Sequence, residues 1–127
     1  MTYYFSKAID LPFEQAVDKA VSALKAHGFG ILTRIDVRST LQDKIGAEFR
    51  PYVILGACNP KMAYEALKAE DKIGVMLPCN VIVQEVGGKT EVAAVDPVAS
   101  MQAIQNVALA AIARSVGEEL KAAVQEM

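Results

Sequence analysis

The sequence predicts an α+β fold, with a mainly antiparallel sheet of about five strands and helices packed on one of its faces. Apolar residues alternate with period two in some segments and recur at helical spacing in others, in the order β-α-β-(short α)-β-α-β-β-α. The pair Gly87-Gly88 separates two alternating segments, which is typical of a tight hairpin. No regular βαβ repeat is present, so the pattern favours antiparallel pairing.

Size and composition indicate an ordinary soluble domain. The chain has 127 residues, which suits a single domain over residues 1–127, and 53% of them are apolar against 22% charged. The net charge is −2 without a basic stripe, so we expect no nucleic acid partner. Polar residues interrupt the most apolar stretch, residues 92–112, so we expect no membrane span. We expect no secretory signal either, and a cytoplasmic protein with reduced thiols.

The first strand is predicted over residues 2–8, where successive side chains fall into two alternating sets. Asp10 and Pro12 suit the start of a helix, as an Asx cap and an early proline. Gly28 is expected to end this helix in the C-cap position. His27 lies in its last turn, where a cation interacts favourably with the helix dipole, so a surface capping role explains this histidine.

The second strand is predicted over residues 29–37. One face of it is expected to carry Phe29, Ile31, Thr33, Ile35 and Val37. The run from Ser39 to Gln42 has a capping-box pattern and predicts a short helix that ends near Gly46. Residues 49–58 are apolar on both faces, which is typical of a central strand.

The next helix is predicted to begin at Asn59-Pro60, with an asparagine cap before a proline at the first helical position. The side chains expected to bury this helix are Met62, Ala63, Ala66 and Leu67. Residues 74–77 and 80–86 are predicted as strand, with a bend or bulge at Pro78. The hairpin then leads into a strand over residues 90–95.

Asp96-Pro97 repeats the cap-plus-proline pattern and begins a helical tail. The apolar face of the tail is expected to carry Ile104, Ala108, Ala111, Ile112, Val116, Leu120 and Val124. Asn106 and Gly117 are possible breaks, so one bent helix and two separate helices both remain open.

Several segments of the chain resemble the domain of unknown function 302 family. They are GFGILTRIDV at residues 28–37, FRPYVILGACNP at 49–60, LPCNV at 77–81 and AVDP at 94–97. The resemblance implies a small bacterial or archaeal α+β protein whose antiparallel sheet is classed with the TATA-box-binding-protein-like folds. That class describes architecture and does not imply DNA binding. The resemblance implies no particular activity.

The only two cysteines, Cys58 and Cys79, are each followed by an asparagine, Asn59 or Asn80, at a predicted strand end. They are candidates for catalysis and for ligand contact, because a helix N-terminus after Cys58 would favour a thiolate. The alternatives are small buried hydrophobic side chains or a shared soft metal. Their 21-residue separation matches no zinc or thioredoxin spacing, so we predict no metal site and no cofactor.

A second candidate site joins Asp36, Arg50 and Lys44. If the second and third strands pair, Asp36 and Arg50 lie close together and the cluster suits a small anion or carboxylate. The alternative is a structural ion pair. Asn80 is either bonded to the backbone near Pro78 or directed into a pocket.

The sequence favours a homodimeric small-ligand-binding or regulatory module, with a pocket at the ends of the second, third and fourth strands and a small anionic or apolar metabolite as ligand. The alanine-rich last helix motivates the dimer. A thiol-dependent enzyme or redox protein using Cys58 and Cys79 is the alternative, and a soft-metal carrier is a weaker one. Phosphate-loop, dinucleotide and serine-hydrolase motifs are absent, so the sequence leaves open whether any reaction is catalysed.

Overall fold

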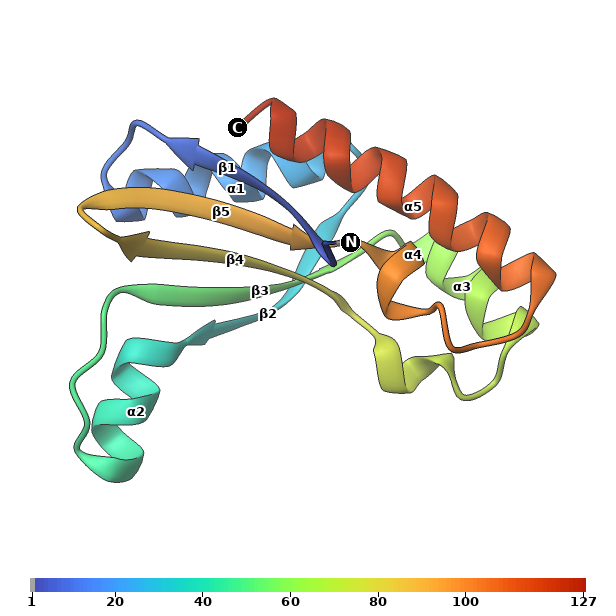
Figure 1. Ribbon diagram of the computed structural model, residues 1–127, viewed down its shortest axis with the longest axis horizontal. Coiled ribbons are helices and arrows are strands. Elements are labelled where there is room, and N and C mark those ends of the chain that lie inside the picture. Colours follow the sequence, from blue (N-terminus) through green and yellow to red (C-terminus); the bar gives the residue numbers. More distant parts are fainter. Residues whose placement is uncertain (1) are drawn as a thin grey trace.

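The computed structural model describes residues 2–127 and confirms the predicted α+β fold. One antiparallel sheet has the strand order β1-β5-β4-β3-β2. Its strands are β1 (Tyr4–Ile9), β2 (Gly30–Asp36), β3 (Tyr52–Cys58), β4 (Cys79–Val86) and β5 (Lys89–Val95). The helices are α1 (Phe13–Ala26), α2 (Val37–Ile45), α3 (Pro60–Ala69), α4 (Pro97–Ser100) and α5 (Val107–Gln125), with a 3₁₀ helix, η1, at Ile73–Met76. Helices α1 and α5 pack on the same face of the sheet (Figure 1).

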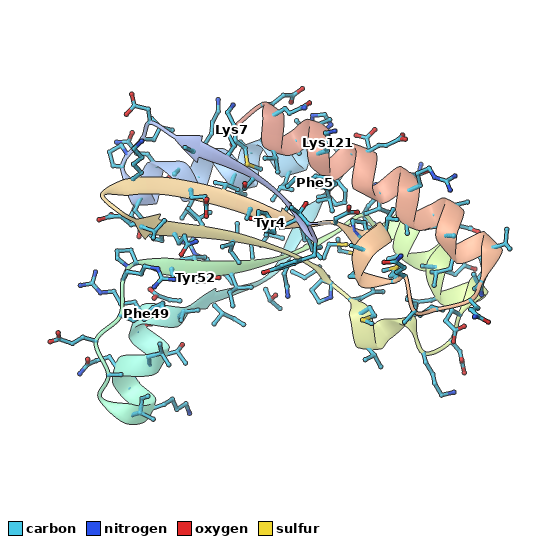
Figure 2. All side chains as sticks on the ribbon, in the orientation of Figure 1. Tyr4, Phe5, Lys7, Phe49, Tyr52 and Lys121 are labelled. Carbon is cyan, nitrogen blue, oxygen red and sulfur yellow. The ribbon has the colours of Figure 1, made fainter. Side chains whose placement is uncertain are left out.

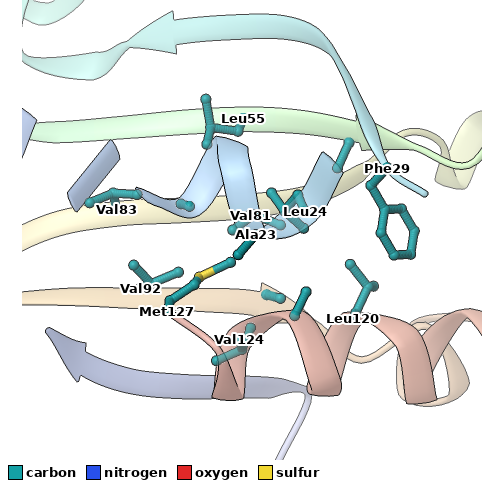
Figure 3. Packing of buried hydrophobic residues seen from close by; sticks show 14 of the residues in the cluster. Ala23, Leu24, Phe29, Leu55, Val81, Val83, Val92, Leu120, Val124 and Met127 are labelled. Carbon is teal, nitrogen blue, oxygen red and sulfur yellow. The ribbon is translucent and has the colours of Figure 1, made fainter. Parts of the chain in front are cut away.

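The main core lies between that face and these two helices. Strand residues Leu55, Val81 and Val92 are fully buried, and they meet Leu24 of α1 and Leu120 of α5 (Figure 3). Each such side chain contributes about 1.5–3 kcal/mol relative to an exposed position. A smaller cluster of buried residues lies beside the main core, and it consists of Ala66, Ile73, Met101, Leu109 and Ala113.

A register shift in β2 overturns the predicted single face of that strand. Ile31 pairs with Ala57, whose side chain is buried on the helix-covered face, whereas Thr33 pairs with Gly56. The intervening Leu32 is the extra residue of a bulge, so Thr33 and Ile35 move to the opposite face from Ile31. A bulge depends on the neighbouring strand, and the alternation within β2 does not reveal it.

Side-chain caps set most helix starts. Asn59 Oδ1 accepts a hydrogen bond from the Met62 amide at 3.3 Å, and Asp96 Oδ1 accepts one from Val98 at 3.0 Å, so both predicted caps are confirmed. The predicted starts of α1 and α2 are wrong. Helix α1 follows Pro12 and has no side-chain cap, so Asp10 does not cap it.

Helix α2 begins earlier than the predicted capping box. Asp36 Oδ1 accepts a hydrogen bond from the Ser39 amide at 3.1 Å, so the cap lies three residues before Ser39. The predicted end of α2 is confirmed, since Gly46 has a left-handed conformation with φ 65°. Gly28 likewise has φ 87° after α1, as predicted.

The tail contains two helices that are separated before Asn106. The Asn106 side chain caps α5 by accepting from the Leu109 amide at 3.1 Å. Gly117 does not break α5, and a Cβ there would lie 3.6 Å from the Pro97 ring of α4. The predicted apolar face is partly wrong, because Ala108 and Ala111 are exposed.

Two other predictions are corrected near η1. Ile73–Met76 forms a 3₁₀ turn in place of the predicted strand over residues 74–77. Leu67 of α3 is 45% exposed and does not bury that helix, whereas Ala66 does.

Within residues 2–127, no helix covers the second face of the sheet, and α2 projects from its β2–β3 edge (Figure 1). No residue of α2 is buried. Among the described residues, no helix combines the length and apolarity that crossing a membrane requires.

Candidate functional site

The two cysteines border one cavity of about 30 Å³, which is room for one or two water-sized groups. Cys79 begins β4 and pairs with Ala57 of β3, and Cys58 is the next residue along β3, so the two cysteines lie at adjacent strand ends, which the sequence left open. The other lining residues come from α3, α4, α5 and neighbouring segments. They are Phe29, Ala57, Asn59, Met62, Ala63, Ala66, Leu77, Pro78, Pro97, Met101, Leu109, Ile112, Ala113 and Val116.

The cavity lies where the main core meets the smaller cluster. Phe29 and Val116 belong to the main core, whereas Met101 and Leu109 belong to the smaller cluster, and all of them border the cavity. A molecule in this space would therefore contact both clusters at once.

Burial keeps both thiols protonated. Both cysteines are free in the described structure, with Cys58 half-buried and Cys79 buried. Burial raises the pKa of Cys58, and burial together with the nearby Cys58 charge raises the pKa of Cys79 to about 11. Neither cysteine has the lowered pKa of an activated nucleophile.

Asn59 and Asn80 have different surroundings. Asn59 caps α3 and also borders the cavity. Asn80 is exposed on the second face of the sheet, because alternation along β4 directs it away from Cys79. It borders a hollow of about 460 Å³ whose other residues include Tyr4, Tyr52 and Ile82.

No hydrogen bond or ion pair joins the predicted cluster of Asp36, Arg50 and Lys44 within the described residues. Arg50 Nε donates to Gln84 Oε1 at 2.9 Å, and its guanidinium lies 4.3 Å from the centre of the Phe49 ring. Asp36 serves as the cap of α2. Within residues 2–127 no ion pair links these three residues.

The predicted anion site therefore reduces to an open groove of about 790 Å³ that Asp36 and Arg50 border. Arg38 and Glu48 also border the groove, whereas Lys44 does not. Its charges are of both signs, so the groove does not favour an anion.

His27 is the C-cap residue of α1, as its position predicts, and its side chain also joins that helix to the end of the chain. Its Nδ1 lies 2.9 Å from Glu119 Oε2, its Nε2 lies 2.7 Å from Glu126 Oε2, and its side chain is 17% exposed. Hydrogen bonds to Glu119 and Glu126 raise the pKa of His27, and the bond to Glu119 has the larger effect. His27 does not border the cavity, and its two ring nitrogens bond Glu119 and Glu126 and neither cysteine.

The comparison with known proteins agrees with this architecture. The family described as "Domain of unknown function DUF302" matches residues 5–127. The chain belongs to the DUF302 family. It is also similar to an uncharacterised conserved DUF302 protein from Bacillus stearothermophilus, whose crystal structure superposes with a TM-score of 0.93 at 28% sequence identity. The match covers 99% of this chain and 98% of that one. No curated protein matches the sequence.

Sequence reasoning missed two sulfur atoms of the DUF302 cavity. Met62 was expected only to bury α3, but it also borders the cavity. Met101 follows α4 and reaches the cavity through the tertiary fold, so no local pattern identifies it. Across the described residues, no group of three or more His, Cys, Asp or Glu side chains is arranged to hold a metal ion.

Proposed function

We propose that this DUF302 protein is a homodimeric module that binds a small ligand, with a regulatory role, in the cavity between Cys58 and Cys79. It acts in the cytoplasm, where thiols stay reduced. The single observation that supports the proposal is the position of this cavity. Both cysteines border it, and so do residues of both buried clusters. Apolar sites with few polar groups are typical of small-molecule binding.

The lining favours an apolar or sulfur-binding ligand over the anionic one that the sequence also allowed. Of the residues that the structure describes, those bordering the cavity include no charged side chain, so a carboxylate or phosphate there would lack a counter-charge. A ligand that joins the two buried clusters would stabilise α3 and α4 against the sheet. This coupling is the basis of the regulatory role.

Filling the cavity tests the proposal. Ala63 is half-buried in α3 and borders the cavity, so the added carbons of Ala63→Leu would compete with a ligand for this space. Ala110→Leu adds the same atoms at an exposed position of α5 and is the matched control. We expect xenon and fragments of a few heavy atoms to shift the backbone amide NMR signals around the cavity in the wild type and in Ala110→Leu. In Ala63→Leu these shifts should disappear. A wild-type chain whose cavity signals respond to none of these probes contradicts the proposal.

Thiol-dependent catalysis or redox chemistry is the second candidate. The adjacency of Cys58 and Cys79 on paired strands supports it. The raised pKa values of both thiols and the uncharged lining weigh against it, because a nucleophilic cysteine needs a nearby cation or base.

A second copy of the chain is the partner that we propose for the uncovered sheet face. The last helix is a poor candidate for the interface, because Leu109, Val116 and Leu120 of α5 are already buried within their own chain. The second face of the sheet instead has half-buried or exposed apolar side chains, including Tyr4 at 40% and Ile35 at 46% exposure. Such a face is typical of interaction surfaces.

The projecting helix α2 supplies the complementary surface. None of its residues is buried, and Ile45 at its end is 73% exposed. We call α2 and the segment that joins it to β3, residues 37–51, the arm. Phe49 and Tyr52 lie where this arm joins β3 (Figure 2). In a two-fold dimer the arm of each chain covers part of the other chain's sheet, so both uncovered surfaces become buried by one symmetric contact.

A further inference from the structure

A hollow of about 460 Å³ lies on the second face of the sheet, and it shares no lining residue with the cysteine cavity. We call it the sheet hollow. Its volume lies within the range of small-molecule sites, which is roughly 300–1,000 Å³. The lining residues belong to β1, β3, β4 and β5, with Tyr3 directly before β1. Paired strands, and not long loops, therefore position the side chains around it.

The strand register arranges these side chains in rows across the sheet. Tyr52, Gln84 and Glu91 are direct cross-strand partners on β3, β4 and β5. Two residues further along the strands, about 7 Å away, Ile82 pairs with Ala93. The side chain of Ala93 is a single methyl group, so this apolar row forms the floor of the sheet hollow.

Aromatic rings lie on both sides of that floor (Figure 2). Tyr52 belongs to the polar row on one side, and Tyr4 lies on the other side, where it pairs with Val95 of β5. Tyr3 also borders the sheet hollow, and its ring contacts Tyr4 edge to face with the ring centres 5.1 Å apart. Aromatic side chains beside an apolar floor suit a flat apolar group.

Glu91 is the only charged residue that borders the sheet hollow within residues 2–127. Its Oε1 accepts a hydrogen bond from Gln84 Nε2 at 3.0 Å, and no ion pair of the described residues includes it. The amide of Gln84 is held in this orientation because its own oxygen accepts from Arg50 Nε at 2.9 Å. Arg50 does not border the sheet hollow, and its guanidinium lies on the Phe49 ring. The half-buried Glu91 carboxylate is therefore available to a ligand cation.

We infer that the sheet hollow is a second ligand site, for a small molecule that joins a flat apolar group to a protonated amine. The apolar group lies on Ile82 and Ala93 between the tyrosines, and the ammonium group donates a hydrogen bond to Glu91. An anionic ligand is disfavoured, because the sheet hollow offers a carboxylate and no cation. Every residue of this site belongs to one chain, so the site requires neither the cysteine cavity nor the dimer. In the proposed dimer a second copy would lie over the sheet hollow and enclose the ligand.

Three probes with the same phenyl group test this inference. They are phenethylamine, which is protonated at neutral pH, the uncharged phenethyl alcohol and the anionic hydrocinnamate. Each is titrated into the isotope-labelled chain, and the amide NMR shifts of β4 and β5 give its affinity. We expect phenethylamine to bind in the millimolar range and phenethyl alcohol to bind about tenfold more weakly, because the alcohol lacks the charge-assisted hydrogen bond. Hydrocinnamate should shift no signal of these strands.

Two variants, each with a matched control, test the roles of the carboxylate and the floor. Glu91→Gln should lower the affinity for phenethylamine about tenfold and leave the affinity for phenethyl alcohol unchanged. Glu118→Gln is its control, since Glu118 is exposed on α5 and does not border the sheet hollow. Ala93→Leu fills the floor and should abolish binding of both probes, whereas Ala110→Leu at an exposed position of α5 should bind them like the wild type.

The site is wrong if the wild type binds phenethylamine no more tightly than phenethyl alcohol, or if Glu91→Gln binds phenethylamine as tightly as the wild type. Binding that persists in Ala93→Leu would place the probes elsewhere and overturn it too. Sedimentation of the same samples separates the site from the dimer. A monomeric chain that binds phenethylamine through Glu91 supports the site and contradicts the dimer alone.

Discussion

At the scale of single residues, burial determines the chemistry of the two thiols. Cys58 precedes a helix N-terminus, a position that lowers thiol pKa values in reactive cysteines. Its pKa is nevertheless raised, because the sulfur lies in apolar surroundings and the lining offers no cation. Desolvation by burial is the cause of this shift.

Iodoacetamide alkylation measured against pH checks this balance and the thiol-enzyme alternative. We expect Cys58 to react at neutral pH more slowly than free cysteine, and Cys79 to react more slowly still. With a pKa of about 11, Cys79 has roughly one thiolate in ten thousand molecules at pH 7. In urea both residues should react like free cysteine, which controls for the reagent. A midpoint below that of free cysteine for either residue in the folded protein would instead support nucleophilic or redox chemistry.

Two identical Cys-Asn pairs thus have different roles in the fold. After Cys58 the strand ends, and Asn59 caps the next helix while it still borders the cavity. After Cys79 the strand continues, so alternation places Asn80 on the opposite face of the sheet. The cap at Asn59 follows from its local sequence, whereas the position of Asn80 depends on where β4 begins.

At the scale of elements, His27 ties the end of α1 to the end of α5. Its two ring nitrogens face Glu119 and Glu126, and both carboxylates are partly exposed. Because these partners favour the protonated ring, the pKa of His27 is raised in the folded protein. The resulting stability is fully present below the unfolded value of 6.5 and is lost as pH rises through the folded pKa.

Urea unfolding between about pH 5.5 and about pH 8 measures this contribution and avoids the thiol titrations at higher pH. We expect the free energy of unfolding to fall with rising pH, by up to about 1 kcal/mol, since solvent screens the two partly exposed carboxylates. His27→Gln should remove this part of the pH dependence. His27→Gln unfolding with the same pH slope as the wild type would show that His27 does not hold the two helices together.

Local signals in the sequence predicted most elements of the fold. The caps at Asn59 and Asp96, the Gly87-Gly88 hairpin and the end of α1 depend on residues within one turn of each other, so one short segment contains all the information. The bulge at Leu32 could not be predicted in this way. It depends on the register between β2 and β3, which only the assembled sheet defines.

The candidate site was less predictable than the fold. The sequence identified both cysteines as residues at strand ends, because each lies at the end of an apolar run, but whether the two strands are neighbours depends on the assembled sheet. Met101 joins them only after α4 and α5 fold over the strand ends. The expected Asp36–Arg50 pair does not form, because Arg50 bonds Gln84 and stacks on Phe49 while Asp36 caps α2.

At the scale of the whole molecule, the two faces of the sheet differ in what covers them. One face packs against α1 and α5, and Met127 at the end of the chain reaches into that core (Figure 3). The other face has no helical layer, and α2 extends from its edge without burying any residue. In the dimer that we propose, a second copy would cover the sheet face and pack against α2, and this complementarity is the reason for the proposal.

Sedimentation velocity at tens of micromolar tests the dimer, a concentration chosen for ordinary affinities. We expect the wild type to sediment as a dimer. Ile82→Lys places a charge at a half-buried position on the uncovered face, next to Tyr52 and Asn80, and should weaken association by about 100-fold, or about 3 kcal/mol. Val107→Lys adds the same charge at a position that is 90% exposed at the start of α5 and should leave the dimer intact.

Ile45→Lys at the end of the arm should weaken association as Ile82→Lys does, because the arm and the face belong to one interface. A monomeric wild type would contradict the dimer, and dissociation by Val107→Lys alone would move the interface to α5.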